Sequence, residues 1–177
     1  IKVPKELIAR QRHITLCMDT MWVNGLRFLT TVSRRIIYRT AQRIKSQQAH
    51  VCRSALAPII QIYNKAQFRV KYIHCDNEYR PIVQSIEEAF QVRFNLAAAN
   101  EHVPEAEVNN KVIKERVRAN FHRLPYNKLP LRLVETLVME SAKKLNYFPP
   151  KGGVSPYYSP RMMLHGERLD YHRHCAT

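Results

Sequence analysis

The order of the sequence patterns predicts an α/β domain with a mixed five-stranded sheet and helices on both faces. Three strand-like segments follow one another near the start of the chain. Helix-like and strand-like segments then alternate, and two long helices end the series. The 177 residues suffice for one domain with a core and are too few for two of ordinary size.

A hairpin signal predicts the first two strands. His13 to Val23 and Leu26 to Ser33 are largely apolar, and Asn24-Gly25 stands between them. Asn-Gly at such a place is the strongest short hairpin signal, because both turn residues adopt a positive φ. We therefore expect the two strands to pair antiparallel. Further strands are expected at 36–44, 68–75 and 93–99.

Apolar residues at helical spacing predict the helices. The first helical segment contains Pro58, so we expect a kink or an early stop there. A stretch rich in Pro, Gly and Tyr predicts a loop over 148–160, followed by a short helix over 160–164. The long helices are expected at 46–63, 79–92, 104–124 and 130–146.

These patterns divide the chain into three parts. We expect a polar, basic lead-in at 1–12, the core domain at 13–147 and a closing loop and short helix at 148–177. No apolar run reaches the roughly 18 residues of a membrane-spanning helix. Because the chain begins at Ile1 without Met, we expect it to be a piece of a longer product.

Charge is the strongest compositional signal. The net charge is +15, from 29 Lys and Arg against 14 Asp and Glu. Such an excess favours a polyanionic partner, most commonly nucleic acid, although a ribosomal or membrane-surface protein could share it. The four cysteines lie far apart, and no secretory signal opens the chain, so we expect reduced thiols inside the cell.

Three carboxylates occupy informative places. Asp19 lies in the middle of a predicted strand, where an acid is disfavoured, and Asp76 directly follows an apolar strand. Glu107 lies near the start of a helix, followed on the same face by the basic residues Lys111, Lys114 and Arg118. Each has an ordinary alternative: a hydrogen-bonded structural Asp, a helix N-cap and a solvated first-turn acid.

The three acids together suit divalent metal chemistry. Converging carboxylates repel one another unless cations bridge them, and Mg²⁺ or Mn²⁺ prefers such oxygen ligands. Two such ions can align the attacking and leaving oxygens of a phosphodiester. The basic stripe formed by Lys111, Lys114 and Arg118 suits a phosphate backbone.

Long segments of the chain resemble the integrase core of copia-type retrotransposons, a branch of the retroviral integrase superfamily. The resemblance runs from about Ile14 to Asp170. It rests on four segments: LCMDTMWVNGLRFLTTVSR, KYIHCDNEYRP, HVPEAEVNNKVIKERVR and SPRMMLHGERLDY. The first resembles the family's opening hairpin, the second and third its later acidic motifs, and the fourth the stretch that closes such cores.

The resemblance implies a ribonuclease H-like fold and a function. Asp19, Asp76 and Glu107 would be the catalytic, metal-binding acids and would hold two Mg²⁺ or Mn²⁺ ions. The implied reaction is 3′-end processing of element DNA and its joining to target DNA, without a small-molecule substrate or a membrane. Asn109, Lys111 and Lys114 fall where the family's helix meets DNA, and Arg118 extends the stripe. Assembly into at least a dimer and action in the nucleus are also implied.

Departures from the family pattern keep other interpretations open. Between Asp76 and Glu107 lie 30 residues, fewer than is usual, and Val108 stands where an Arg is usual. Glu105 is a rival third acid, but two residues place it on roughly the opposite side of the helix. The alternatives are a ribonuclease H-like nuclease, which cuts without joining, and a non-catalytic nucleic-acid-binding module.

Two further groups of residues are assigned ordinary roles. His172, His174 and Cys175 form a compact cluster, but the chain offers no second ligand pair at zinc-binding spacing, so a polar tail is the preferred interpretation. Trp22, Tyr157 and Tyr158 have rings that can stack on bases, but we expect them to pack in the core or in a loop.

Overall fold

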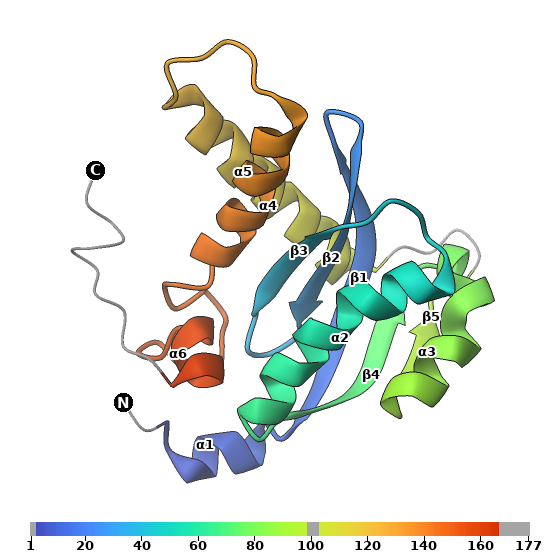
Figure 1. Ribbon diagram of the computed structural model, residues 1–177. Helices are drawn as coiled ribbons and strands as arrows, with labels where there is room; N and C mark the ends of the chain where they lie inside the picture. The colour runs from blue at the N-terminus through green and yellow to red at the C-terminus, as the bar shows by residue number, and fades with distance from the viewer. Residues whose placement is uncertain (1–2, 99–102, 167–177) are drawn as a thin grey trace.

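The computed structural model describes residues 3–98 and 103–166. Its centre is one five-stranded sheet with the strand order β3-β2-β1-β4-β5 (Figure 1). The mixed sheet with helices on both faces confirms the predicted fold class. The strands are β1 (His13–Val23), β2 (Leu26–Ser33), β3 (Arg39–Arg43), β4 (Arg69–Cys75) and β5 (Arg93–Leu96).

Strand directions change at β1. It pairs antiparallel with β2, and β2 pairs antiparallel with β3, whereas the β1–β4 and β4–β5 pairs are parallel. The predicted hairpin is confirmed: Asn24 and Gly25 have φ of 47° and 74°, the positive values that a tight two-residue turn needs. This turn leaves β1 and β2 as a long ribbon that extends beyond β4.

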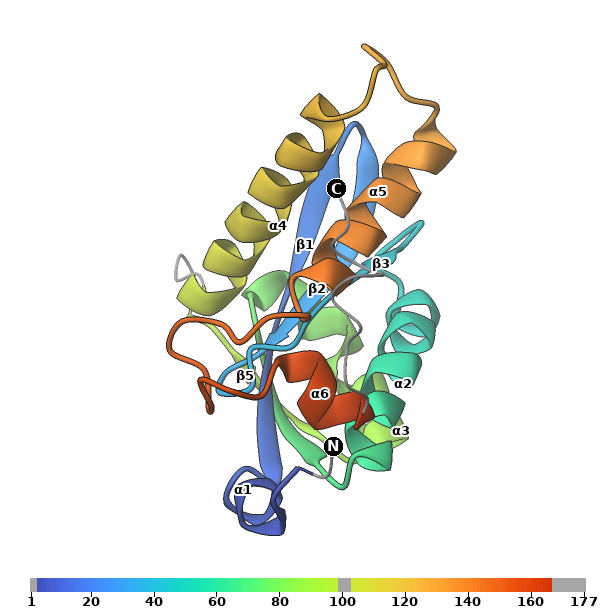
Figure 2. The ribbon, with the colours of Figure 1, turned by 90° about the vertical axis from the view of Figure 1, so that its left-hand side faces the viewer.

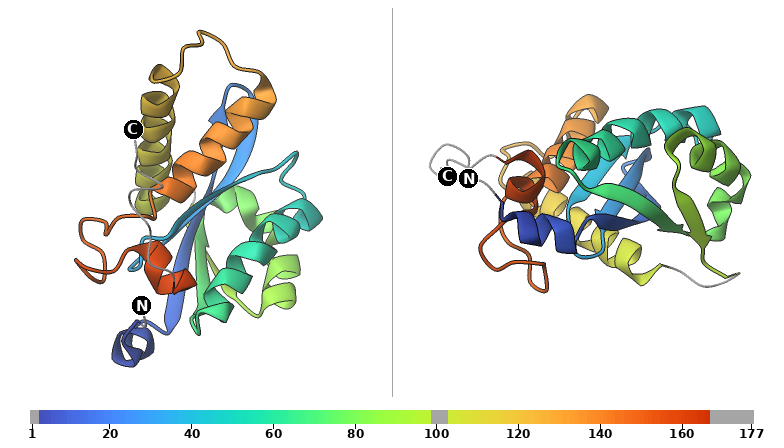
Figure 3. Two further views of the ribbon diagram at one scale, coloured as in Figure 1. Left: turned by 60° about the vertical axis from the view of Figure 1, so that its left-hand side comes forward. Right: turned by 90° about the horizontal axis from the view of Figure 1, so that it is seen from below.

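The helices form two layers. They are α1 (Lys5–Arg10), α2 (Ala49–Lys65), the 3-10 helix η1 (Asn77–Ile82), α3 (Val83–Phe90), α4 (Pro104–His122), α5 (Leu131–Lys144) and α6 (Pro160–His165). Figure 2 shows α4 and α5 alongside the β1–β2 hairpin, and Figure 3 shows α2 and α3 on the opposite side of the sheet. Within the described residues, no helix is long and apolar enough to cross a membrane.

Side chains of β1 point alternately to the two faces of the sheet and contribute to the hydrophobic core on each face. Leu16 and Met18 are fully buried in the cluster that contains Leu56 of α2. The alternate residue Met21 packs with Ile113 of α4, in a second cluster. Because neighbouring strand residues point to opposite faces, β1 is covered on both sides, and its polar residues lie between two layers of helix.

The helix α2 differs from its prediction. It continues through Pro58 to Lys65, so the expected early stop is wrong. Pro58 and Ser54 are both exposed, so the Ser54 carbonyl that loses its helical partner faces water. Meanwhile Leu56, Ile59 and other apolar residues on the inner side are buried. Their burial outweighs the roughly 3 kcal/mol that an internal proline costs.

Smaller differences occur elsewhere. The lead-in contains the short helix α1, which the sequence pattern did not predict. The segment after Asp76 begins as a 3-10 helix and becomes α-helical only at Val83, because Pro81 interrupts regular hydrogen bonding. The described cysteines Cys17, Cys52 and Cys75 are buried and free, in agreement with reduced thiols.

Candidate functional site

The parallel pairing of the two central strands sets Asp19 beside Asp76. Cys17 of β1 is the register partner of His74 of β4. Two residues further along each strand stand Asp19 and Asp76, at the carboxyl-terminal end of β4. This edge is where open α/β sheets place their ligand sites, and the charge of Asp76 acts on Asp19.

Hydrogen bonds fix both oxygens of the Asp19 carboxylate. Its Oδ1 accepts from the backbone N–H of Thr20 at 2.6 Å, and its Oδ2 accepts from Nδ2 of Asn110 at 2.6 Å. The Oδ1 of Asn110 in turn accepts from the hydroxyl of Thr30 at 2.6 Å. Thr30 is the cross-strand neighbour of Asp19. The relay from Thr30 through Asn110 to Asp19 therefore connects α4 to β1 and β2.

The pKa of Asp19 is raised to about 6. Burial, which disfavours the charged form, is the largest cause, and the negative charges of Asp76 and Glu78 raise the pKa further. The bonds from the Thr20 N–H and from Asn110 act in the opposite direction. A carboxylate that is desolvated and faced by other acids favours a cation beside it.

A polar group adjoins Asp19 on the side of η1. The hydroxyls of Thr20 and Tyr79 lie 2.5 Å apart. Gln47 donates from Nε2 to Thr20 at 3.0 Å and to Glu78 at 3.0 Å. Sequence analysis missed both Glu78 and Gln47. Glu78 could have been predicted, because it lies only two residues after Asp76. Gln47 could not, because its place at the site depends on the path of the loop before α2.

Glu107 lies in the first turn of α4 and is exposed. The sequence analysis expected an acid of α4 to approach Asp19. Asn110, one helical turn after Glu107, donates a hydrogen bond to Asp19. Within the described residues, no three or more His, Cys, Asp or Glu side chains gather closely enough to hold one metal ion. The structure thus brings two of the three predicted acids together, and the role of Glu107 stays a prediction.

The rival acid Glu105 has a different partner. Its Oε1 forms an ion pair with Nε of Arg34 at 2.8 Å. The same guanidinium lies 3.3 Å from Nδ1 of His74 through Nη2. Arg34 follows β2 directly, so this pair attaches the beginning of α4 to the sheet. The choice of Glu107 over Glu105 as the third acid stays a prediction.

The predicted DNA-contacting residues of α4 divide into two groups. Lys111 and Arg118 are exposed and Lys114 is half-buried, so the basic stripe faces outward. Asn109 is only 1% exposed, and its Oδ1 accepts from Nη1 of Arg39 at 2.7 Å. The structure therefore places Asn109 inside the fold, where it joins α4 to β3, because it lies on the helix face that carries Ile113.

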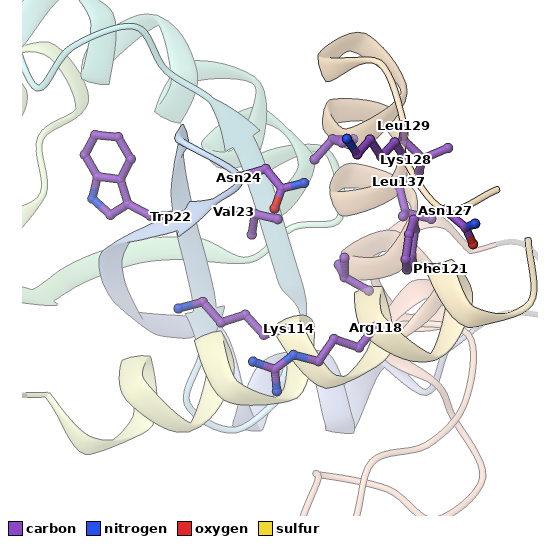
Figure 4. Close-up of a pocket in the computed structure, with 12 residues that line it drawn as sticks. Trp22, Val23, Asn24, Lys114, Arg118, Phe121, Asn127, Lys128, Leu129 and Leu137 are labelled. Atoms are coloured by element: carbon purple, nitrogen blue, oxygen red, sulfur yellow. The ribbon is translucent and has the colours of Figure 1, made fainter.

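A hollow of about 510 Å³ lies between the tip of the β1–β2 hairpin and the α4–α5 pair (Figure 4). Trp22 lies at one end of it, in strand β1, and is 50% exposed, so the expectation that this ring packs in the core or in a loop is wrong. Tyr157 is exposed in the 148–160 loop, while Tyr158 packs partly against the core. The cluster of His172, His174 and Cys175 lies outside the described residues.

Comparisons with known proteins support the fold. No family model matches the chain, and no curated protein matches it. Among solved structures, 314 chains match. One is the crystal structure of the catalytic core domain of BIV integrase, with a TM-score of 0.59 and 18% sequence identity. The match covers 86% of this chain and 93% of that one. The chain therefore has the ribonuclease H-like fold of an integrase catalytic core.

Proposed function

We propose that this chain is the catalytic core of an integrase, which processes the 3′ end of element DNA and joins it to target DNA. The observation that supports the proposal most is the Asp19–Asp76 pair at the centre of an integrase-core fold, beside a basic helix. Phosphoryl transfer needs mainly positioning and charge neutralisation, so carboxylates and cationic side chains suffice on the protein side.

A divalent cation is part of this proposal. Carboxylate oxygens are the donors that Mg²⁺ or Mn²⁺ prefers, and burial together with neighbouring acids raises the pKa of Asp19, which supports the proposal. Asp19 and Asp76 would hold the ion, and Glu107 would be the third ligand. When bound, the metal supplies Lewis-acid stabilisation of negative charge on the phosphate oxygens.

The chain's own residues perform the remaining tasks. Asn110 and the Thr20 N–H hold the Asp19 carboxylate in one orientation, with lone pairs still open on both oxygens. Lys111, Lys114 and Arg118 bind successive phosphates along α4, and the protein's net charge of +15 favours association with DNA. The specific origin we propose is a copia-type retrotransposon, with nuclear action and at least a dimeric assembly.

The test is a product analysis with labelled duplex DNA that carries element ends. In Mg²⁺ or Mn²⁺, the protein is expected to yield a shortened 3′ end and longer joined products. Glu107→Gln, which removes the charge and nearly keeps the shape, is expected to abolish both. Glu115→Gln is the matched control, because Glu115 is exposed two helical turns further along α4. Nicking without joining would identify a nuclease and overturn the proposal.

One observation favours a second candidate, a nucleic-acid-binding module without catalysis. In the described part of the chain, the third acid is not gathered with Asp19 and Asp76 into a metal-binding group. Asn110 contacts Asp19 instead. If the protein bound DNA with the predicted salt dependence but bound neither Mg²⁺ nor Mn²⁺, this second candidate would replace the first.

A further inference from the structure

The chain has one tryptophan, Trp22, and its ring is half exposed although it stands near the end of a central strand. The proposed reaction does not use it. Exposing an indole forgoes much of the stabilisation that burial would bring, and exposed aromatic rings are enriched where proteins bind partners. Trp22 is therefore a candidate contact for a ligand.

The partner strand holds the indole in place. Arg27 of β2 is the cross-strand neighbour of Trp22, and its guanidinium carbon lies 4.5 Å from the ring centroid. This cation–π contact occupies one face of the indole, and half of the residue is still exposed. Among the described residues, the buried Nε of Arg27 has no hydrogen-bond partner. The pair thus presents a flat, cation-backed aromatic surface.

The hollow beside Trp22 is cationic. Lys114, Arg118 and Lys128 line it, and none of the described residues that line it is an Asp or a Glu. Figure 4 shows Lys114 and Arg118 along one side, with Asn24 of the hairpin between Trp22 and the far end of the hollow. Cations beside an aromatic platform match a nucleic-acid strand, whose phosphates need the charges while its bases stack.

The position along β1 sets the distance from the acids. Trp22 is three residues beyond Asp19, roughly 10 Å along an extended strand, and its side chain leaves β1 on the opposite face from that of Asp19. Bases in a duplex already stack on one another, whereas an unpaired base can stack on an aromatic side chain such as Trp22.

We propose that Trp22 and Arg27 form a stacking site for an unpaired nucleobase at the hairpin end of the cationic hollow. Lys114, Arg118 and Lys128 bind the adjoining backbone phosphates. The ligand is a DNA end with a short single-stranded extension, and the inference rests on the proposed function only for the identity of that DNA. Recognition is by shape and stacking and is therefore tolerant of sequence.

The experiment uses the tryptophan as its own reporter. Labelled DNA of equal duplex length, either blunt or with a three-nucleotide single-stranded 3′ extension, is titrated while anisotropy and tryptophan emission are recorded at one salt concentration. We expect the extended DNA to quench the emission and blunt DNA to leave it nearly unchanged. Trp22→Ala is expected to weaken binding of the extended DNA about five- to tenfold, and of blunt DNA less than about twofold.

Two control variants separate stacking from general loss of surface. Trp22→Phe keeps an aromatic face and is expected to retain most of the preference for the extension. Tyr157→Ala removes an aromatic ring that is 82% exposed in the 148–160 loop and is expected to change neither affinity. Equal weakening of both DNAs by Trp22→Ala, or binding of the extended DNA without quenching, would overturn the stacking site.

The outcomes also distinguish this inference from the proposed function. Quenching by the extended DNA in a protein that never joins DNA supports the stacking site and contradicts the integrase proposal. Suppose instead that the protein joins DNA, and that Trp22→Ala changes neither this activity nor the affinity for extended DNA. That result supports the integrase proposal and contradicts the stacking site. A wild-type protein that binds neither DNA contradicts both.

Discussion

At the scale of single residues, Asp19 carries an electrostatic cost that its position creates. The chain buries this carboxylate, faces it with Asp76 and Glu78, and offsets the cost only partly with two donors. Hydrogen bonds to the charged form favour ionisation of Asp19, but burial and the neighbouring acids oppose it more strongly. A cation bound beside the carboxylate would offset this cost, as the metal-binding proposal requires.

Replacing Asp19 with Asn should stabilise the metal-free protein at pH 7.5. In the folded protein the pKa of Asp19 is about 6, above its ordinary value of 3.8. The free energy of unfolding of the wild-type protein therefore falls as the pH rises from about 3.8 through about 6. With allowance for partial exposure, the gain should be on the order of 1–2 kcal/mol. Asn110 can flip its carboxamide to pair with the new Asn, so no donor is left unpaired.

Urea denaturation at pH 7.5 and below pH 4 measures this difference. The gain should shrink towards zero at the lower pH, where both states of the wild-type protein hold the proton. Glu115→Gln, on the exposed side of α4, should change stability at neither pH. An Asp19→Asn protein less stable than wild type at pH 7.5 would mean that the carboxylate serves the fold.

At the scale of elements, the β1–β2 hairpin and α4 position the site. The hairpin turn fixes the register that sets Thr30 opposite Asp19, and Asn110 then connects both strands to the helix. A second connection runs from Arg39 of β3 to Asn109 of α4. Burial lowers the pKa of the Arg39 guanidinium, yet this bond keeps the group paired inside the fold.

Gly25→Ala should destabilise the protein by about 1 kcal/mol. Gly25 has a φ of +74°, and an added Cβ would meet no atom within 4 Å, so the cost is conformational and not steric. Gly25→Asn should lose less, because Asn tolerates a positive φ better than Ala. Urea midpoints at constant slope measure both. Equal stability of the Ala variant and the wild type would refute the tight-turn geometry.

The elements that the sequence predicted well are those set by local chemistry. Asn24-Gly25 encodes its own turn, and the apolar runs around Asp19 and before Asp76 encode two central strands. The bond from Asn110 to Asp19 was not predictable, since it depends on the angle at which α4 crosses β1. The same holds for the burial of Asn109 and the exposure of Trp22, which depend on where α4 and α5 end against the hairpin.

At the scale of the whole molecule, charge and topology act together. The parallel β1–β4 pair brings its two acids to one edge of the sheet, while α4 extends from this edge towards the hairpin tip (Figure 2). Lys111, Lys114 and Arg118 therefore continue outward from the acids in one direction. A DNA strand that follows them passes the acids at one end and Trp22 near the hairpin.

Replacing Lys111, Lys114 and Arg118 together with Gln should reduce the salt dependence of DNA binding. Each lost phosphate contact removes about one unit from the slope of log K against log salt, so the slope should fall by about two to three. A control triple, Arg53→Gln, Lys65→Gln and Arg69→Gln, removes equal charge from exposed positions elsewhere. Equal slopes for the two triples would show that binding follows net charge alone.

The proposed function depends on one claim, that Asp19 and Asp76 together bind a divalent cation. Calorimetric titration of Mn²⁺ into the protein tests it most directly, because metal binding needs neither DNA nor an assembled multimer. Wild type and Glu115→Gln should bind Mn²⁺ alike, and Asp76→Asn should bind it at least about tenfold more weakly while keeping its circular dichroism spectrum. If Asp76→Asn bound Mn²⁺ as tightly as wild type, or if wild type bound none at millimolar concentration, the claim would be contradicted.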